Sequence, residues 1–215
     1  LGNETRGVWG GGRINPSNDA SNVMDYITIS TLGNATDFGD LTVARGNIGG
    51  NVNSSTRGIF HGGYAGADSN VIDYITIGST GNATDFGDLT RARQNPGGFS
   101  STVRGVMGGG FNPGTSPGTS TDIIDYITIA STGNATDFGD LAFSTTYADG
   151  VSNNTRGVFS GLNNPSAPGA DGTFGNAPQI LYVTIASTGN TTLFGELTAR
   201  RYGTAPASNG HGGLS

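Results

Sequence analysis

The stretch DYITISTLGNATDFGDL, residues 25–41, is repeated three more times along the chain. Two copies are nearly identical, DYITIGSTGNATDFGDL (73–89) and DYITIASTGNATDFGDL (125–141), and the fourth, LYVTIASTGNTTLFGEL (181–197), is looser. A phrase of the type TRGVWGGG precedes each copy, and its arginine recurs at spacings of 51, 47 and 52 residues, as Arg6, Arg57, Arg104 and Arg156. A period of roughly 40–50 residues built of short strands is typical of propeller blades rather than helical solenoids. Function is therefore expected in what the repeats do not share.

Each repeat predicts four strands. The first is the segment of the type ARGNIGGNVNSS from Ala44, followed by the TRGVWGGG, DYITI and ATDFGDL segments. Val, Ile, Tyr, Phe and Thr dominate these runs, while Gly, Asn, Pro and Ser separate them, as strands and turns require. The Gly-Asn step in STGNATD suits a tight hairpin. The chain is therefore predicted to be all-β.

The two ends of the chain predict how many blades there are. The sequence opens with a second strand and closes with a first strand, ARRYGTAPASNG (199–210). We therefore expect one domain, 1–215, forming a four-bladed kelch-like β-propeller closed by pairing of the C-terminal strand with the N-terminal blade, because closure removes exposed edges. The expected units are 1–43 plus 199–215, 44–91, 92–143 and 144–198. The alternative is a fragment of a larger propeller, and the start at Leu1 instead of Met fits a processed chain or the C-terminal portion of a longer one.

Composition narrows the class of protein. The 215 residues carry a net charge of −6, and all ten basic residues are arginine, which disfavours nucleic acid as a partner. There is no cysteine, so disulfides and cysteine chemistry are excluded. No apolar run approaches the roughly 20 residues of a membrane helix, so membrane insertion is not expected.

Several residues resemble the kelch pattern. In the first unit these are Gly11-Gly12, Tyr26, Phe38, Leu41 and Ala44-Arg45, with Phe where kelch repeats usually carry Trp. The longer phrase DYITIASTGNATDFGDLT, followed by Arg and a Ser-rich strand, is similar to repeats in structural proteins of large tailed cyanophages, and the closing SNGHGGL is similar to the end of such proteins. The resemblance implies a virion protein of a tail, fibre or surface decoration, with no known catalytic residues, and fold alone does not establish function.

Residues that recur in every repeat are interpreted as structural. They are the arginine row Arg6, Arg57, Arg104 and Arg156, the aspartate row Asp25, Asp73 and Asp125, and the aromatic row Phe38, Phe86, Phe138 and Phe194. Arginine–carboxylate pairs are expected to join neighbouring strands, and the phenylalanines to pack between blades. The alternative for the carboxylates is a ring holding Ca²⁺ through oxygen ligands. In the fourth repeat Leu181 stands at the position of Asp25 and Leu193 at the position of Asp37, which breaks such a ring at both positions.

Other motifs do not predict catalysis. The DFG triplets lack the phosphate-binding and catalytic loops of a kinase, and the Gly runs lack a strand-to-helix context. The N-x-T frames at Asn34, Asn82, Asn134 and Asn190 are explained by the hairpin, with glycosylation as the alternative. The two histidines, His61 and His211, stand far apart. We therefore expect no enzyme activity, no metal and no cofactor; a polysaccharide hydrolase using paired carboxylates is the less favoured alternative.

The segments of variable length are the predicted binding surface. They join the Gly-rich and DYITI strands, at 13–24, 64–72, 111–124 and 163–180. Variation at one connection places irregular loops on one face of a repeat protein. The candidate ligand-binding residues there are Arg13, Asn15, Asn18, Tyr64, Phe111, Asn112, Asn163, Asn164 and Phe174. Amides and aromatics suit a sugar, so the sequence predicts a virion component that binds host surface glycans by multivalent attachment. The alternatives are solvated loops without a ligand, and a purely structural subunit that contacts other virion proteins or its own copies.

Overall fold

The chain is all-β, as predicted. The computed structural model describes residues 1–112, 119–168 and 174–207, and these contain strands but no helix. Side chains are described throughout except at residues 51, 119, 164–168 and 174–176. The alternation of β-branched or aromatic residues with small and polar ones gives each strand two faces. Both faces are buried in the two sheets that stand between the first sheet and the last.

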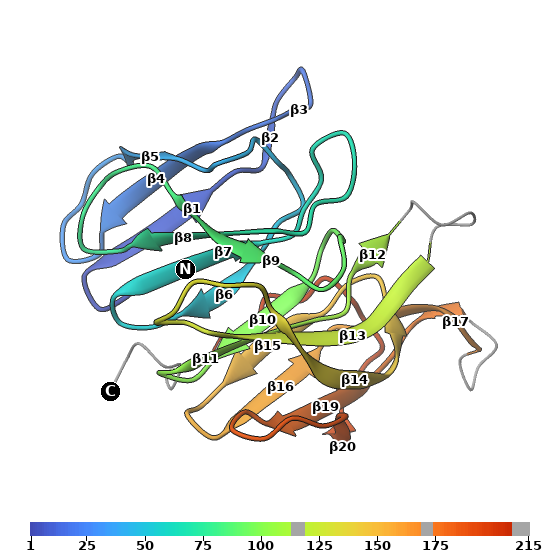
Figure 1. Cartoon of the computed structure of the whole chain (residues 1–215). Helices are drawn as coiled ribbons and strands as arrows, with labels where there is room; N and C mark the ends of the chain where they lie inside the picture. Colours follow the sequence, from blue (N-terminus) through green and yellow to red (C-terminus); the bar gives the residue numbers. More distant parts are fainter. Residues whose placement is uncertain (113–118, 169–173, 208–215) are drawn as a thin grey trace.

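Each repeat forms one antiparallel sheet (Figure 1). Sheet 1 consists of β1 (Arg6–Gly10), β4 (Val23–Thr28) and β5 (Thr36–Asp40). Sheet 2 consists of β6 (Gly49–Asn53), β7 (Arg57–His61), β8 (Val71–Thr76) and β9 (Thr84–Asp88). Sheet 3 consists of β10 (Gly97–Ser100), β11 (Arg104–Gly108), β13 (Thr119–Thr128) and β14 (Thr136–Thr145), with β12 (Phe111–Asn112) beside β13. Sheet 4 consists of β15 (Asp149–Ser152), β16 (Arg156–Ser160), β19 (Gln179–Thr184) and β20 (Thr192–Glu196).

Two of the segments of variable length form small two-stranded sheets of their own. β2 (Arg13–Ile14) pairs with β3 (Asp19–Ala20), and β17 (Asn163–Pro168) pairs with β18 (Phe174–Asn176). Each small sheet lies between the second and third strands of its repeat. The length variation seen in the sequence therefore falls on this one connection and leaves the sheets intact.

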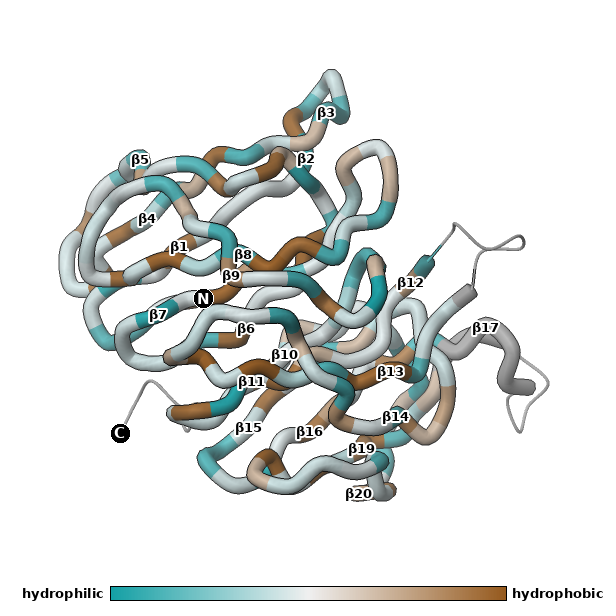
Figure 2. The backbone as a smooth tube through the Cα atoms, in the orientation of Figure 1, coloured by the Kyte–Doolittle hydropathy of each residue, from teal (hydrophilic) through white to brown (hydrophobic). Residues whose placement is uncertain are grey.

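The hydrophobic core lies between consecutive sheets. One cluster joins Met24 and Phe38 of sheet 1 to Phe60 of sheet 2. A second joins sheets 2 and 3, and a third joins sheets 3 and 4. Figure 2 shows that hydrophobic residues are distributed along the strands. We call these three contacts between consecutive sheets the first, second and third junctions.

The strands that begin sheets 2, 3 and 4 lie in series. Asn53 of β6 donates from Nδ2 to the Gly2 carbonyl (2.9 Å), Ser100 of β10 donates to the Asn53 carbonyl (2.7 Å), and Ser152 of β15 donates to the Ser100 carbonyl (2.7 Å). Leu1 and Gly2 take the corresponding place beside β1, because Val8 N–H donates to the Leu1 carbonyl at 2.9 Å. We call this hydrogen-bonded series the inner edge.

The predicted closing strand is not seen in the described residues. Residues 199–207 form no strand, and residues 208–210 lie outside the described part of the chain. Sheets 1 and 4 stand at the two ends of the series in Figure 1, blue and orange-red respectively. In the described residues the structure thus establishes one antiparallel sheet for each of the four repeats, in chain order, and closure into a ring stays a prediction.

Candidate functional site

The recurring aspartates take part in the junctions. At the first junction Arg45 Nη1 lies 2.8 Å from Asp73 Oδ2, with both side chains fully buried, and Thr42 Oγ1 donates to Asp73 Oδ1 at 2.5 Å. At the second, Arg93 Nη2 lies 3.0 Å from Asp125 Oδ2, and Thr90 Oγ1 donates to Asp125 Oδ1 at 2.5 Å. We call each group a Thr–Arg–Asp cluster.

The arginine partner differs from the one expected. The predicted row Arg6, Arg57, Arg104 and Arg156 forms no ion pair with the aspartates in the described residues; each guanidinium lies over the tyrosine of the third strand, at 4.7, 4.3, 4.3 and 4.6 Å from the ring centroid. Three of them also donate to a carbonyl of the next sheet, Arg6 to Ile77, Arg57 to Ile129 and Arg104 to Ile185. The aspartates pair instead with the arginines that follow the fourth strand, because the chain carries those to the neighbouring sheet.

The hairpin motifs also join consecutive sheets. Gly81 N–H donates to the Phe38 carbonyl (2.7 Å), and Asp40 N–H donates to Asn82 Oδ1 (3.1 Å). The same bonds recur at the other junctions, as Gly133–Phe86 with Asp88–Asn134, and Gly189–Phe138 with Asp140–Asn190. Any side chain at Gly39 would meet the Gly81 carbonyl, which explains glycine in DFG. The N-x-T asparagines at positions 82, 134 and 190 therefore have a structural role. The phenylalanines of the first three repeats are buried, whereas Phe194 is exposed.

The predicted loop residues are spread over several places. Asn15 and Asn18 lie at the exposed turn between β2 and β3. Arg13 lies over the Tyr64 ring (5.5 Å), and the Tyr64 carbonyl accepts from Gly46 N–H. Asn112 Nδ2 donates to the Ala92 carbonyl (2.9 Å). The remaining members of that prediction are Phe111, Asn163, Asn164 and Phe174. The side chains of Asn164 and Phe174 lie outside the described part of the structure.

One pocket brings a predicted residue together with unpredicted ones. It has a volume of about 330 Å³ and is lined by Asn47, Gln94, Asn95, Phe111, Thr146 and Tyr147. Apart from Phe111, these residues come from three successive linkers, the segments that join one sheet to the next. We call it the linker pocket. It carries side chains that differ from repeat to repeat, because Gln94 corresponds to Gly46 and Thr146, and Tyr147 corresponds to Asn47 and Asn95.

Hydrogen bonds hold the linker pocket in place. Asn47 Nδ2 donates to Gln94 Oε1 (2.7 Å), and Asn95 N–H donates to the Asn47 carbonyl (2.8 Å). Gln94 and Phe111 exchange backbone hydrogen bonds of 2.9 and 2.8 Å. Asn47 and Asn95 both have φ of 54°, a left-handed conformation that asparagine tolerates well. The amides are therefore positioned by the backbone of neighbouring repeats.

An aromatic surface adjoins the linker pocket. The rings of Tyr147 and Tyr202 stack at 5.6 Å between centroids, and both side chains are exposed. Asn163 is next to the pocket, because its carbonyl accepts from Thr146 N–H at 2.9 Å. No charged side chain lines the pocket. Uncharged amides and hydroxyls beside exposed rings can hydrogen-bond and stack on a neutral polyhydroxylated ligand.

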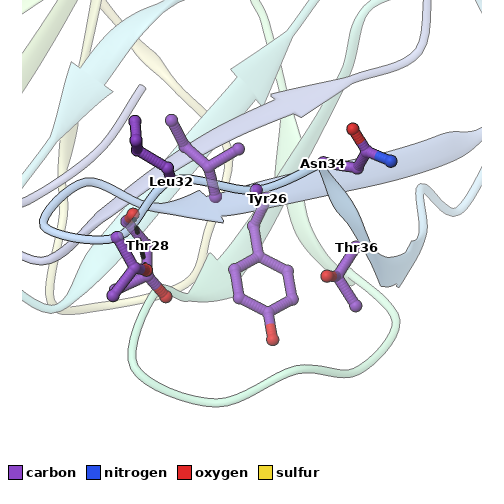
Figure 3. A pocket seen from close by; sticks show the side chains of 8 residues that line it. Tyr26, Thr28, Leu32, Asn34 and Thr36 are labelled. Atoms are coloured by element: carbon purple, nitrogen blue, oxygen red, sulfur yellow. Dashed lines mark hydrogen bonds between the residues drawn. The ribbon is translucent and has the colours of Figure 1, made fainter.

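A second kind of pocket recurs at the hairpins between the third and fourth strands. Figure 3 shows the one in sheet 1, where Tyr26 lies between Thr28 and Thr36, with Leu32 and Asn34 along the hairpin. Its volume is about 220 Å³, and a pocket of about 200 Å³ is lined by the corresponding residues of sheet 2. Because these pockets follow from the repeated hairpin itself, they are weaker candidates than the linker pocket.

The linker pocket was not predicted from the sequence. Asn47, Gln94, Asn95, Thr146 and Tyr147 fall in segments interpreted as the start of a first strand. The one signal is that the corresponding phrases LTVAR, LTRAR and LAFST are followed by different pairs of residues, Gly-Asn, Gln-Asn and Thr-Tyr. Their proximity depends on the stacking of sheets.

The chain was compared with known protein families and with curated proteins. No family model matches the chain, and no curated protein matches it. Among the described residues, no group of three or more His, Asp or Glu side chains is placed to hold a metal ion. The same part of the chain has no helix of the length and apolarity needed to span a membrane.

Proposed function

We propose that the chain is a four-bladed kelch-like β-propeller module of a phage virion, in a tail, fibre or surface appendage, that attaches to host cell-surface glycans. The linker pocket is the observation that carries the binding part of this proposal. It combines amides with aromatic rings, it draws on three repeats, and two of its side chains, Gln94 and Tyr147, have no identical counterpart in the other repeats.

The chemistry of the linker pocket favours a neutral sugar over other ligands. A phosphate or nucleic acid ligand would call for basic side chains, and the lining residues are uncharged. Asn47 and Gln94 offer donors and acceptors to hydroxyl groups, and Tyr147 offers a ring face. One such pocket binds weakly, and many copies on a particle raise the avidity.

The carboxylates support a binding role in preference to the hydrolase alternative. Asp73 and Asp125 are buried in ion pairs. Asp37 accepts from the Gly39 N–H in its own turn at 3.1 Å, and Asp85 and Asp137 do the same in their repeats. No carboxylate lines the linker pocket, so a pair of acids flanking a bound sugar is not provided there.

Binding of the purified chain to an immobilised panel of neutral and acidic glycans tests the sugar-binding role. Tyr147→Ala and Gln94→Ala should each lower binding to the selected neutral glycan about two- to ten-fold, since stacking and a directed hydrogen bond each contribute about 0.5–1.5 kcal/mol. Thr31→Ala, in the hairpin pocket of sheet 1, is the matched control and should bind like the parent chain. Equal loss in all three variants, or binding to no glycan, would contradict the assignment of the linker pocket.

The virion assignment has its own test. Immunogold electron microscopy with antibody to this chain should label fibre tips or the baseplate of purified particles. Even label along a filament or shell would favour the purely structural alternative, for which two exposed end sheets are suitable. Label on host cells alone would contradict the virion assignment and leave the glycan-binding result standing.

A further inference from the structure

The sequence contains one more threonine–arginine pair and one more aspartate than the two Thr–Arg–Asp clusters use. The linkers contain three threonine–arginine pairs, Thr42 with Arg45, Thr90 with Arg93, and Thr198 with Arg201. The third strands contain three aspartates at the matching position, Asp25, Asp73 and Asp125. Two pairs meet two aspartates in buried clusters. Arg201 and Asp25 remain, and both are exposed.

The linker between sheets 3 and 4 explains why there are as many threonine–arginine pairs as aspartates. Between sheets 3 and 4 the threonine and arginine are replaced by Ala142 and Thr145, and the aspartate they would meet is replaced by Leu181. The threonine–arginine pair and the aspartate are thus both absent from the third junction. The presence of Thr198 and Arg201 after sheet 4 therefore points to an acceptor beyond that sheet, and Asp25 of sheet 1 is the copy left over.

The hairpin contacts leave the same two sheets unmatched. At each junction a phenylalanine carbonyl and a backbone N–H two residues later bond the Gly-Asn step of the next hairpin. On sheet 4 the corresponding residues are Phe194 and Glu196, and on sheet 1 they are Gly33 and Asn34. Arg156 likewise corresponds to the arginines that donate to the isoleucine carbonyl of the next sheet, and Ile29 is the isoleucine without such a donor in the described residues.

On these two faces, aromatic side chains are exposed whose counterparts are buried at the internal junctions. Trp9 is 58% exposed, whereas its counterparts Phe60, Met107 and Phe159 are at most 5% exposed. Phe194 is 54% exposed, whereas Phe38, Phe86 and Phe138 are each 2% exposed. The two faces together carry the apolar and polar residues that are buried in contact at the three internal junctions.

We propose that the exposed face of sheet 1 receives the end of sheet 4 and the linker Leu197–Arg201 of the same chain, with Asp25 accepting from Thr198 and pairing with Arg201. This fourth junction rests on the propeller proposed above and supplies its closure through side chains, in addition to any pairing by the C-terminal strand. It has the same residue types as the first and second junctions.

The placement of the last linker favours its own chain as the occupant. Tyr202 stacks on Tyr147, and Thr204 Oγ1 donates to Asp149 Oδ2 at 2.7 Å, at the start of β15. These contacts hold the residues after the linker beside the start of β15, the first strand of sheet 4, whose end Ser152 belongs to the inner edge that begins at Gly2. A tethered segment also has an effective concentration in the millimolar range, well above that of a dilute second copy.

The absence of cysteine allows a direct test by crosslinking. We would introduce Asp25→Cys with Thr198→Cys, the positions whose counterparts Thr42 and Asp73 are in hydrogen-bond contact, and oxidise the full chain at micromolar concentration. The expected product is a monomer with an internal disulfide. The matched control pairs Asp19→Cys with Thr198→Cys and should not crosslink. No disulfide, or disulfide-linked oligomers whose amount grows with concentration, would overturn the proposal; the second result would mean that copies join head to tail.

Trp9 gives a readout that does not depend on the disulfide. It is the only tryptophan, so acrylamide quenching of its fluorescence reports the face of sheet 1. In the parent chain we expect a quenching constant several-fold below that of Arg201→Ala, with Arg91→Ala as control and circular dichroism to check folding. Quenching that is equally strong in all three proteins would overturn the proposal. The glycan assay is separate, because the linker pocket is lined by the three linkers between sheets 1 and 4 and by Phe111, and none of these residues is changed in the crosslinking and quenching variants.

Discussion

The first and third junctions join sheets of the same kind with different chemistry. At the first junction, Arg45 and Asp73 form a fully buried ion pair. At the third junction the corresponding residues are Thr145 and Leu181, both buried. The Thr145 hydroxyl donates to the Tyr147 carbonyl at 2.5 Å and accepts from the Asn163 N–H at 2.8 Å. Leu181 joins the hydrophobic cluster with Phe138.

This comparison indicates that the residues of the Thr–Arg–Asp cluster are exchanged together. Taking charges out of water is costly, and a buried ion pair contributes little net stability compared with well-packed apolar residues. Removing one partner alone is far more costly than replacing both. The third junction therefore represents a complete exchange, and a mixture of the two kinds is expected to be unstable.

The largest effect is expected from breaking the first junction halfway. Arg45→Leu leaves the Asp73 carboxylate buried without its counter-ion, so the free energy of unfolding should fall by about 3–5 kcal/mol. The midpoint of urea unfolding, followed by circular dichroism, measures this.

A triple variant is the control for that experiment. Thr42→Ala, Arg45→Thr and Asp73→Leu together copy the third junction, and the protein should unfold within about 2 kcal/mol of the parent chain or at higher stability. If the triple variant is as unstable as Arg45→Leu, the contribution of the cluster comes from the volume of its side chains and not from its charges.

The second junction contains a buried histidine, which the first and third junctions lack in the described residues. His61 of β7 stands where the other repeats have Gly10, Gly108 and Ser160. It is fully buried next to Gly49 and Gly98. Burial, followed by the positive charge of Arg93, lowers the pKa of His61 from 6.5 to about 3.

Acid should therefore weaken this junction in particular. The unfolded chain binds a proton at His61 below about pH 6.5, whereas the folded chain does not until about pH 3, so this contribution to stability is complete above pH 6.5 and is lost as the pH falls towards 3. The loss is about 2 kcal/mol by pH 5, at about 1.4 kcal/mol per pH unit. Urea unfolding from pH 7 to 4 measures it. His61→Gly should remove this part of the pH dependence, and His211→Gln should keep it; an unchanged slope in His61→Gly would assign the acid effect to other groups.

Much of the fold could be predicted because its information is local. The β-branched DYITI strand and the Gly-Asn turn specify hairpins by themselves, and their repetition specifies how many. The ion pairs could not be assigned in the same way. The pairing of Arg45 with Asp73 joins two repeats, so the sequence showed the row of aspartates but suggested the wrong row of arginines. The linker pocket was missed for a related reason, because Asn47, Gln94 and Tyr147 meet only after three repeats have stacked.

The smallest expected effect separates internal junctions from the end of the chain. Asn134 accepts the Asp88 N–H at 3.1 Å in a solvent-exposed setting, so Asn134→Ala should cost about 0.5–1 kcal/mol in urea unfolding. Asn34 occupies the same place on sheet 1, where the donor would be Glu196 of sheet 4. If the chain closes through the proposed fourth junction, Asn34→Ala should carry the same cost as Asn134→Ala. A stability unchanged from the parent chain would mean that the Asn34 amide faces solvent and that sheet 1 ends the series, because an exposed amide without a partner loses nothing when it is removed.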